Sequence, residues 1–251
     1  APGAADWRTP DPDNVLVIDT TKGRILVELT PQVAPNHVTR VKELTRSGLY
    51  DGRSFFRVID AFMAQTGDPQ DTGEGGSDKP DLDAEFTFRR GPETPFVQVA
   101  DQTVAEIGFV GSLPVMTQSS MLMPLTRDGK ISGWGLYCPG VAGMARGEAE
   151  ASANSQFFLM RQAYPSLEKR YTAFGRVISG LEAVRAIKVG EPAPSFSLVG
   201  EDGKTHSLAD YKGRIVVLEW TNAECPFVKK HYSGGNMQSL QKTYTGKDVV
   251  W

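Results

Sequence analysis

The alternation of apolar and polar positions at the start of the chain predicts a hairpin followed by a helix. Aliphatic and β-branched runs at 15–19 and 24–29 flank the polar stretch 20–23, which is typical of a hairpin turn. After Pro35 the apolar residues recur with a helical period, and Gly48 follows where a helix C-terminal cap is expected. We therefore expect one face of this helix to be buried, formed by Val38, Val41 and Leu44.

The middle of the chain combines strands with long polar loops. An apolar run predicts a strand over 55–59, and the Gly-, Asp- and Ser-rich stretch 66–80 predicts a long loop. Within the irregular stretch 92–138, Asp128-Gly129 lies between apolar residues and predicts a hairpin. Methionines in this stretch are expected to fill gaps in the core, namely Met116, Met121 and Met123.

The next part of the sequence predicts two more strands and a second helix. Apolar runs indicate a strand over 156–160 and a strand and short helix within 172–187. Many strands, two amphipathic helices and long loops together predict a mainly β fold, a closed antiparallel barrel capped by helices. The expected buried face of the second helix comprises Leu181, Val184 and Ile187.

Composition divides the chain into three parts. Residues 1–14 contain three Pro, one Gly and three Asp, which predicts a flexible arm. Pro192 and Pro194 mark a linker. We expect one domain over 15–188 and a separate segment over 189–251.

The segment after the linker has a different order of elements. A hairpin with a glycine turn precedes an apolar strand over 215–220, and Cys225-Pro226 leads a helix into the final apolar residues 249–251. This β–α–β order is that of an α/β domain, unlike the part before it. The stretch is too short for a whole domain of that kind, so we expect an incomplete one.

The totals exclude several classes of protein. Hydrophobic residues make up 40% of the 251 and charged residues 23%, which is typical of a globular chain. A net charge of −3 argues against binding nucleic acid through phosphate contacts. No apolar stretch approaches the roughly 18 residues that span a bilayer, so we expect no membrane insertion. We also expect a monomer.

The start of the chain bears on location. Ala1 to Ala5 include no Met and no apolar signal core, which fits a mature end left after signal removal or merely a shortened chain. We expect a periplasmic or secreted protein, with a cytoplasmic one as the alternative.

Cysteines and histidines give no indication of a metal centre. Two cysteines and three histidines are too few and too scattered for a ligand pattern, and we expect no metal and no cofactor. A disulfide between Cys138 and Cys225 is allowed by their number alone. We do not expect it, because the two lie in segments predicted to be different domains.

Three motifs lie within 15–188: "SFFRVIDAFMAQTGDP", "GVAGMARGEAEASANSQFFLM" and "YTAFGRV". With them, this part of the chain resembles the cyclophilin family of peptidyl-prolyl isomerases. The resemblance implies an eight-stranded closed antiparallel barrel with two capping helices. It also implies proline-containing polypeptides as substrates.

The resemblance assigns roles to residues of this sequence. Arg57 matches the catalytic arginine, and Gln65 matches the residue that orients this arginine and the substrate. Ala145 and Gln156 match positions that line the groove for residues preceding the proline. The wall of the proline pocket is matched by Phe62, Met63, Phe158 and Leu167.

The sequence departs from the family pattern at three positions of the site. Tyr171 stands where many members carry His and keeps an aromatic wall with a polar tip, so it is also expected to bind substrate. Ser166 stands where many members carry Trp. Arg146 replaces a small polar residue and adds a cation near the groove. These differences affect the expected substrate preference and inhibitor sensitivity, not the reaction.

The chemistry explains why a cation is needed among apolar residues. A peptide bond resists rotation by about 18–20 kcal/mol, because the nitrogen lone pair is delocalised into the carbonyl group. A hydrogen-bond donor aimed at the proline nitrogen favours the twisted state, in which the lone pair is exposed. Arg57 suits this role, whereas a lone arginine in a strand is more often an ion-pair partner.

The first alternative function is a module that binds Xaa-Pro segments without turnover, since binding alone needs no cation at the amide nitrogen. A second comes from a further resemblance. "GEPAPSFSLVGEDGKTHSLADYKGRIVVLEW" and "ECPFVKKHY" resemble the opening of a thioredoxin-like, redoxin-type domain. There Cys225 would lie at a helix N-terminus, which favours a thiolate, so the alternative is a thiol oxidoreductase or peroxidase. The segment lacks a Cys-x-x-Cys pair.

Overall fold

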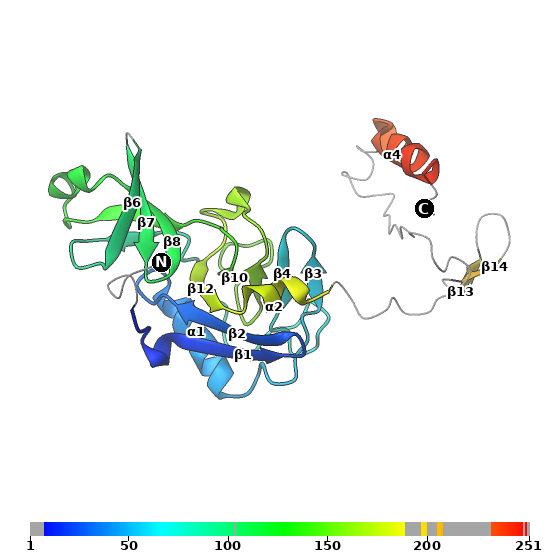
Figure 1. Cartoon of the computed structure of the whole chain (residues 1–251), viewed down its shortest axis with the longest axis horizontal. Coiled ribbons are helices and arrows are strands. Elements are labelled where there is room, and N and C mark those ends of the chain that lie inside the picture. The colour runs from blue at the N-terminus through cyan, green and yellow to red at the C-terminus, as the bar shows by residue number, and fades with distance from the viewer. Residues whose placement is uncertain are drawn as a thin grey trace, which may run out of the picture. The chain divides into compact units, whose positions relative to one another are not determined.

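The computed structural model of the chain separates into two compact units, Ala1–Glu191 and Pro192–Trp251. The larger unit contains two antiparallel sheets, and Figure 1 shows the green strands β6, β7 and β8 at one end of it. The structure describes residues 8–102, 104–188, 197–199, 205–207, 232–247 and 249.

A seven-stranded sheet forms the centre of the larger unit. Neighbouring strands pair antiparallel throughout. In sheet order, the strands are β1 (Val15–Thr20), β2 (Gly23–Leu29), β12 (Ala173–Ser179), β10 (Val141–Met144), β11 (Phe157–Met160), β4 (Met63–Thr66) and β3 (Arg57–Ile59).

A five-stranded antiparallel sheet is formed largely by the segment 91–138. The mainly β fold is confirmed, but the closed eight-stranded barrel is wrong. The strands of this segment pair with one another and with β5, so the seven-stranded sheet stays open as a half-barrel with β1 and β3 at its edges. In order, the second sheet contains β5 (Phe88–Arg90), β9 (Ile131–Gly135), β8 (Leu113–Gln118), β7 (Ala105–Val110) and β6 (Phe96–Gln102).

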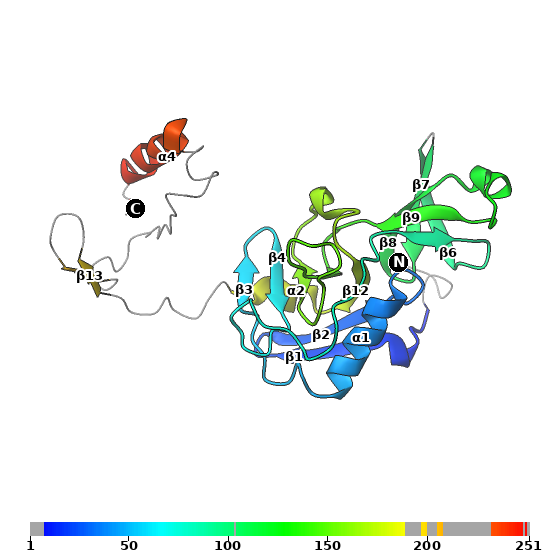
Figure 2. The same cartoon turned by 180° about the vertical axis from the view of Figure 1, so that it is seen from behind.

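Both helices expected in the first domain are present. The first, α1 (Pro35–Arg46), has Pro at its N-terminal turn and packs on the seven-stranded sheet (Figure 2). The second, α2 (Leu181–Ala186), follows β12 directly. Their apolar faces are buried as predicted, because the 3.6-residue period gathers these side chains on one stripe: Val38, Val41, Leu44, Val184 and Ile187, with Leu181 partly buried.

The segment before β9 differs from the prediction. The Asp128-Gly129 turn lies in the long connection between the antiparallel neighbours β8 and β9 and is not a tight hairpin turn. Instead, a 3₁₀-helix, η3 (Ser120–Leu125), precedes this turn, and Gly129 has a φ of +66°. The core-filling role predicted for the methionines is wrong for Met121, whose side chain is 83% exposed on η3.

The described part of the expected arm lies against the larger unit. A single 3₁₀ turn, η2 (Pro12–Asn14), is capped by Asp11. Asp13 forms ion pairs with Lys42 and Arg46 of α1. These contacts attach residues 11–14 to the first helix.

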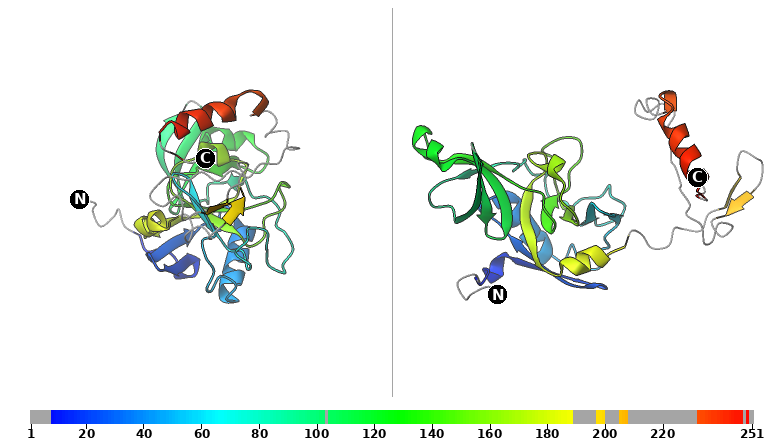
Figure 3. Two further views of the ribbon diagram at one scale, coloured as in Figure 1. Left: turned by 90° about the vertical axis from the view of Figure 1, so that its right-hand side faces the viewer. Right: turned by 45° about the horizontal axis from the view of Figure 1, so that its top comes forward.

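The smaller unit is described only in part. A short hairpin pairs β13 (Ser197–Val199) with β14 (Thr205–Ser207), and a helix, α4 (Asn236–Thr245), is drawn in red in Figure 3. Cys225 and the strand expected over 215–220 lie outside the described residues. Within the described part of the chain, no helix has the length and apolar character needed to cross a bilayer.

Candidate active site

The pairing of three neighbouring strands places the first functional side chains next to one another. Arg57 on β3 pairs with Gln65 on β4, and Gln65 pairs in turn with Phe158 on β11. Side chains of directly paired residues point to the same face of a sheet. The sheet register therefore brings a cation, an amide and an aromatic ring to one surface.

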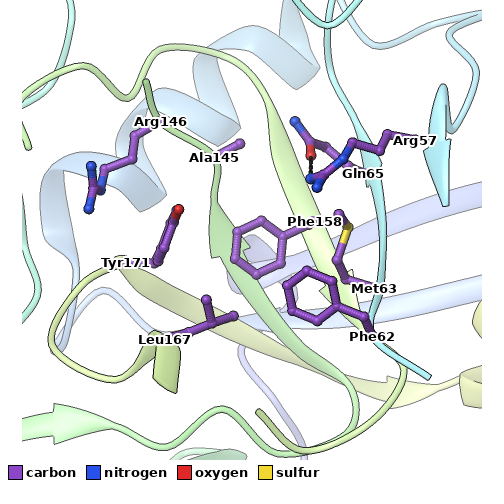
Figure 4. A pocket seen from close by; sticks show the side chains of 9 residues that line it. All are labelled: Arg57, Phe62, Met63, Gln65, Ala145, Arg146, Phe158, Leu167 and Tyr171. Carbon is purple, nitrogen blue, oxygen red and sulfur yellow. Dashed lines mark hydrogen bonds between the residues drawn. The ribbon is translucent and has the colours of Figure 1, made fainter. Parts of the chain in front are cut away.

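A hollow of about 170 Å³ opens at this surface (Figure 4). Of the residues predicted for the isomerase site, only Gln156 and Ser166 do not line it. Met63, Phe158 and Leu167 are buried in its wall, whereas Arg57 is exposed at its rim. The residues around it are Arg57, Phe62, Met63, Gln65, Ala145, Arg146, Phe158, Leu167 and Tyr171.

The guanidinium of Arg57 is held on one edge only. Its Nη1 donates a hydrogen bond to Oε1 of Gln65 at 3.0 Å. Within the described ranges, no carboxylate forms an ion pair with Arg57. The ordinary explanation for an arginine in a strand, a structural ion pair, therefore has no support here.

A chain of hydrogen bonds fixes which way the amide of Gln65 faces. Nε2 of Gln156 donates to the carbonyl oxygens of Gly73 and Gly75 at 3.0 and 2.7 Å. Oε1 of Gln156 is thereby turned toward Gln65, whose Nε2 donates to it at 2.8 Å. Only the oxygen of Gln65 is left to face Arg57.

The loop that supplies these carbonyl groups is itself anchored by Asp68. The carboxylate accepts backbone N–H bonds from Gln70, Thr72, Gly73 and Gly75. Burial alone would raise the pKa of Asp68, but the hydrogen bonds lower it to about 2. The 66–80 loop predicted from composition is thus an ordered support for the site.

Three aromatic side chains contribute to the pocket wall: Phe62, Phe158 and Tyr171. The rings of Phe158 and Tyr171 meet edge to face, with centroids 5.9 Å apart. The ring of Phe62 lies 4.5 Å from that of Tyr164. Leu167 closes the wall from a short 3₁₀-helix, η4 (Pro165–Leu167). The site therefore has an apolar wall, with Arg57 and Gln65 on one side and Arg146 beside Tyr171 on the other (Figure 4).

A second hollow of about 390 Å³ adjoins the first and contains Gln156. Gln65, Ala145 and Arg146 line both hollows, so the two form one groove. The second hollow is lined mainly by glycines and polar residues. Besides Gln156 and the three shared residues, they are Gly73, Glu74, Gly75, Gly76, Asp81, Gly147, Ser152 and Asn154.

A family model described as cyclophilin type peptidyl-prolyl cis-trans isomerase/CLD matches residues 15–199. The chain belongs to this family. A probable peptidyl-prolyl cis-trans isomerase of Brucella suis is 34% identical over 203 residues, which are 76% of this chain and 80% of the relative. The crystal structure of the cyclophilin AquaCyp293 from Hirschia baltica is 37% identical, covers 75% of this chain and 72% of its own, and gives a TM-score of 0.69.

These comparisons also bear on the reaction and on the smaller unit. This cyclophilin is a peptidyl-prolyl cis-trans isomerase. A second model, the AhpC/TSA family, matches residues 189–250, in agreement with the redoxin resemblance. The roles assigned to individual residues remain predictions from the family pattern.

Asn154 belongs to the groove of the cyclophilin but was missed by the sequence analysis. Its side chain accepts hydrogen bonds from Ser77 and donates to Lys79 and Asp81. Asn154 thus fixes the segment 77–81 beside the second hollow. Its position in the Asn-Ser-Gln-Phe-Phe motif was the available signal.

Arg146 was noted as an added cation, but its contacts follow only from the structure. Its guanidinium carbon lies 4.8 Å from the ring centroid of Tyr171. It also donates hydrogen bonds to the backbone oxygens of Arg170, Gly147 and Glu148. The cation is fixed beside the aromatic wall rather than extended into solvent.

Metal chemistry has no candidate residues in the described part of the cyclophilin. No group of three or more His, Cys, Asp or Glu side chains there is arranged to hold a metal ion. Cys138 is half-buried and forms no disulfide within that part. Burial raises the pKa of its thiol, which disfavours the reactive thiolate.

Proposed function

We propose that this isomerase accelerates rotation of Xaa-Pro bonds by directing the free edge of Arg57 at the proline nitrogen. The observation that carries the proposal is the state of this guanidinium. It is aligned by Gln65, has no carboxylate partner among the described residues, and lies at the rim of an apolar hollow. The proline ring would occupy that hollow.

The energetics of the bond explain the need for such a donor. In the planar peptide the nitrogen lone pair is delocalised, and rotation costs about 18–20 kcal/mol. Twisting localises the lone pair and makes the nitrogen a hydrogen-bond acceptor. A donor in this position gains a bond only in the twisted state, so it stabilises the transition state more than the bound substrate.

The apolar wall increases this effect. Phe62, Met63 and Phe158 exclude water from one side of the bound ring. With less water nearby, the field of the guanidinium is screened less. Arginine also keeps its charge at every physiological pH, so no proton transfer is required.

The experiment is a measurement of cis-trans interconversion on a short Xaa-Pro peptide by exchange NMR. We expect catalytic amounts of the protein to raise the interconversion rate far above the uncatalysed one, which takes tens to hundreds of seconds. An unchanged rate with peptide bound would contradict the proposal. That result would favour the alternative, a module that binds Xaa-Pro segments without turnover.

A role in protein folding extends the same proposal. The apolar hollow continues into the second hollow through shared lining residues, which supports an extended polypeptide as substrate. We expect faster refolding of a protein whose slow phase is limited by proline isomerisation. If the slow phase keeps its uncatalysed rate, polypeptide clients are excluded.

Three further expectations remain proposals. A monomer is tested by sedimentation, and absence of nucleic-acid binding by titration with duplex DNA at low salt. A location outside the cytoplasm is tested by fractionation of cells that make the native protein.

The match of 189–250 to the AhpC/TSA family favours thiol chemistry at Cys225 as a second candidate function. Oxidation by peroxide would convert its thiolate to a sulfenic acid and reduce the peroxide. We expect Cys225→Ser to abolish any rapid peroxide consumption and Cys138→Ser to leave it intact. Equal consumption by both variants would exclude this function.

A further inference from the structure

The segment 91–138, which forms most of the five-stranded sheet, also reaches the proline pocket. Its apolar residues share one buried cluster with pocket residues. Val110, Leu113 and Val115 of the segment belong to this cluster together with Phe158 and Leu167. The sheet and the pocket therefore have a common core.

The contacts become specific where the segment leaves β9. The backbone oxygen of Tyr137 accepts a hydrogen bond from the N–H of Tyr164 at 2.8 Å. The ring of Tyr137 stacks on the pocket residue Phe158, with centroids 6.0 Å apart. Tyr137, two residues after β9, thus contacts both the pocket residue Phe158 and the residue that precedes η4.

Trp134, on β9 itself, makes a second set of contacts with the residues after η4. Nζ of Lys169 lies 3.5 Å from the centroid of its ring. Burial raises the pKa of the adjacent Glu168 carboxyl, and the nearby Trp134 side chain partly opposes this rise. Glu168 and Lys169 are consecutive, so the indole lies near two neighbouring side chains.

Lys169 needs such support because of its backbone. Its φ is +58°, in the left-handed region that disfavours residues with a Cβ. The attraction of an ammonium group to a tryptophan ring is among the stronger cation–π contacts. It offsets part of this cost and fixes the turn that follows Leu167.

From these contacts we infer that Trp134 is a positioning residue of the isomerase, which holds Leu167 in the pocket wall through contacts made from the five-stranded sheet. Leu167 immediately precedes the clamped pair. Its backbone oxygen also accepts the N–H of Tyr171 at 3.1 Å, so two pocket residues depend on the same turn. The inference rests on the isomerase function.

The expected effect is on substrate binding rather than on the chemical step. Leu167 and Tyr171 contact the proline ring in both the planar and the twisted state. Loosening them removes uniform binding, which raises KM and leaves kcat nearly unchanged. Loss of Arg57 is expected to act on kcat instead.

The experiment compares Trp134→Ala, Trp134→Phe and Lys169→Met with the wild type in the full chain. We expect KM to rise about fivefold in Trp134→Ala and in Lys169→Met, as loss of one cation–π contact implies. Methionine keeps the Cβ and the left-handed backbone strain, so Lys169→Met removes the ammonium group without relieving the turn. Trp134→Phe keeps a ring and should restore most of the affinity.

Val97→Ala is the matched control, because this side chain is 63% exposed on β6 of the same sheet. It should keep the wild-type KM. The inference is overturned if Lys169→Met keeps the wild-type KM, or if Trp134→Ala lowers kcat alone. Calorimetry of peptide binding tests the role of Trp134 separately from the isomerase function. A wild type without isomerase activity would contradict the proposed function, whereas the peptide affinities of the variants would still test whether Trp134 positions the pocket.

Discussion

Gln65 connects Arg57, the proposed catalytic residue, to the rest of the protein. Its two amide atoms are both used, one by Arg57 and the other by Gln156. We predict that Gln65→Ala lowers kcat about tenfold, because the guanidinium loses its alignment while the apolar pocket remains. Cis-trans exchange of a short peptide measures this.

Gln70→Ala provides the comparison for this variant. Gln70 lies two residues after Asp68. Its side chain is exposed and lines neither hollow. It should keep full activity. A Gln65→Ala enzyme with wild-type kcat would show that Arg57 does not depend on the hydrogen bond to Gln65 for its alignment.

Single residues of the site were predictable to different degrees. Arg57 and Gln65 lie in one contiguous motif, eight positions apart, so their pairing across β3 and β4 is a local consequence of the sequence. The roles of Trp134 and Lys169 were not predictable. Their contact joins positions 35 residues apart and depends on how the five-stranded sheet folds.

At the scale of elements, the loop anchored by Asp68 fixes the orientation of the side-chain amides of Gln156 and Gln65. We predict that Asp68→Asn destabilises the protein by about 2 kcal/mol, because hydrogen bonds to a charged acceptor are weakened. Activity should fall as well, since the carbonyl groups of Gly73 and Gly75 lose their fixed position. Chemical denaturation and the exchange assay measure the two effects.

The pH dependence of stability provides an independent measurement. The pKa of Asp68 in the folded protein, about 2, lies below its ordinary value of 3.8. Its contribution is therefore present above about pH 4 and is lost as the pH falls toward 2. Asp68→Asn should therefore lose less stability than the wild type as the pH falls from about 4 to about 2. If the two proteins unfold in acid to the same extent, Asp68 does not contribute to the pH dependence of stability.

The five-stranded sheet contains a buried ion pair that links three strands. Nη1 of Arg90 on β5 bonds to Glu106 on β7 and to Thr117 on β8. We predict that Glu106→Ala costs about 3 kcal/mol or more, because it leaves a buried cation unpaired. Thermal unfolding of the variant measures this loss.

Replacing both partners distinguishes an unpaired charge from lost packing. In the double variant Arg90→Met with Glu106→Leu, no charge remains to be desolvated, so most of the lost stability should return. Ser120, whose N–H bonds to Glu106, limits the recovery. A double variant as unstable as Glu106→Ala would contradict this account.

Elements whose formation depends on neighbouring residues in the sequence were predicted well. Features that depend on pairing between strands distant in the sequence were not. The helix after Pro35 follows from a 3.6-residue period and a terminal proline, both visible in the sequence. Closure of the barrel depends on which strands meet. The segment 91–138 contains strands of ordinary composition, and nothing local indicates that they pair with one another and with β5.

At the scale of the whole molecule, both hollows belong to the larger unit. Every residue that lines them lies within Ala1–Glu191. We predict that a chain ending at residue 191 keeps kcat/KM within about twofold of the full chain, because no residue of the groove is removed. A loss above tenfold in a folded, shortened protein would show that the redoxin-like segment contributes to the isomerase.

The most direct test of the account compares Arg57→Ala with the wild type on one Xaa-Pro peptide, measuring both the exchange rate of the bound peptide and its affinity. Removing a donor that acts on the transition state is predicted to lower kcat about a hundredfold. Peptide affinity should stay within about threefold, because the apolar pocket remains. Exchange as fast as in the wild type at equal affinity would contradict a catalytic role for this guanidinium.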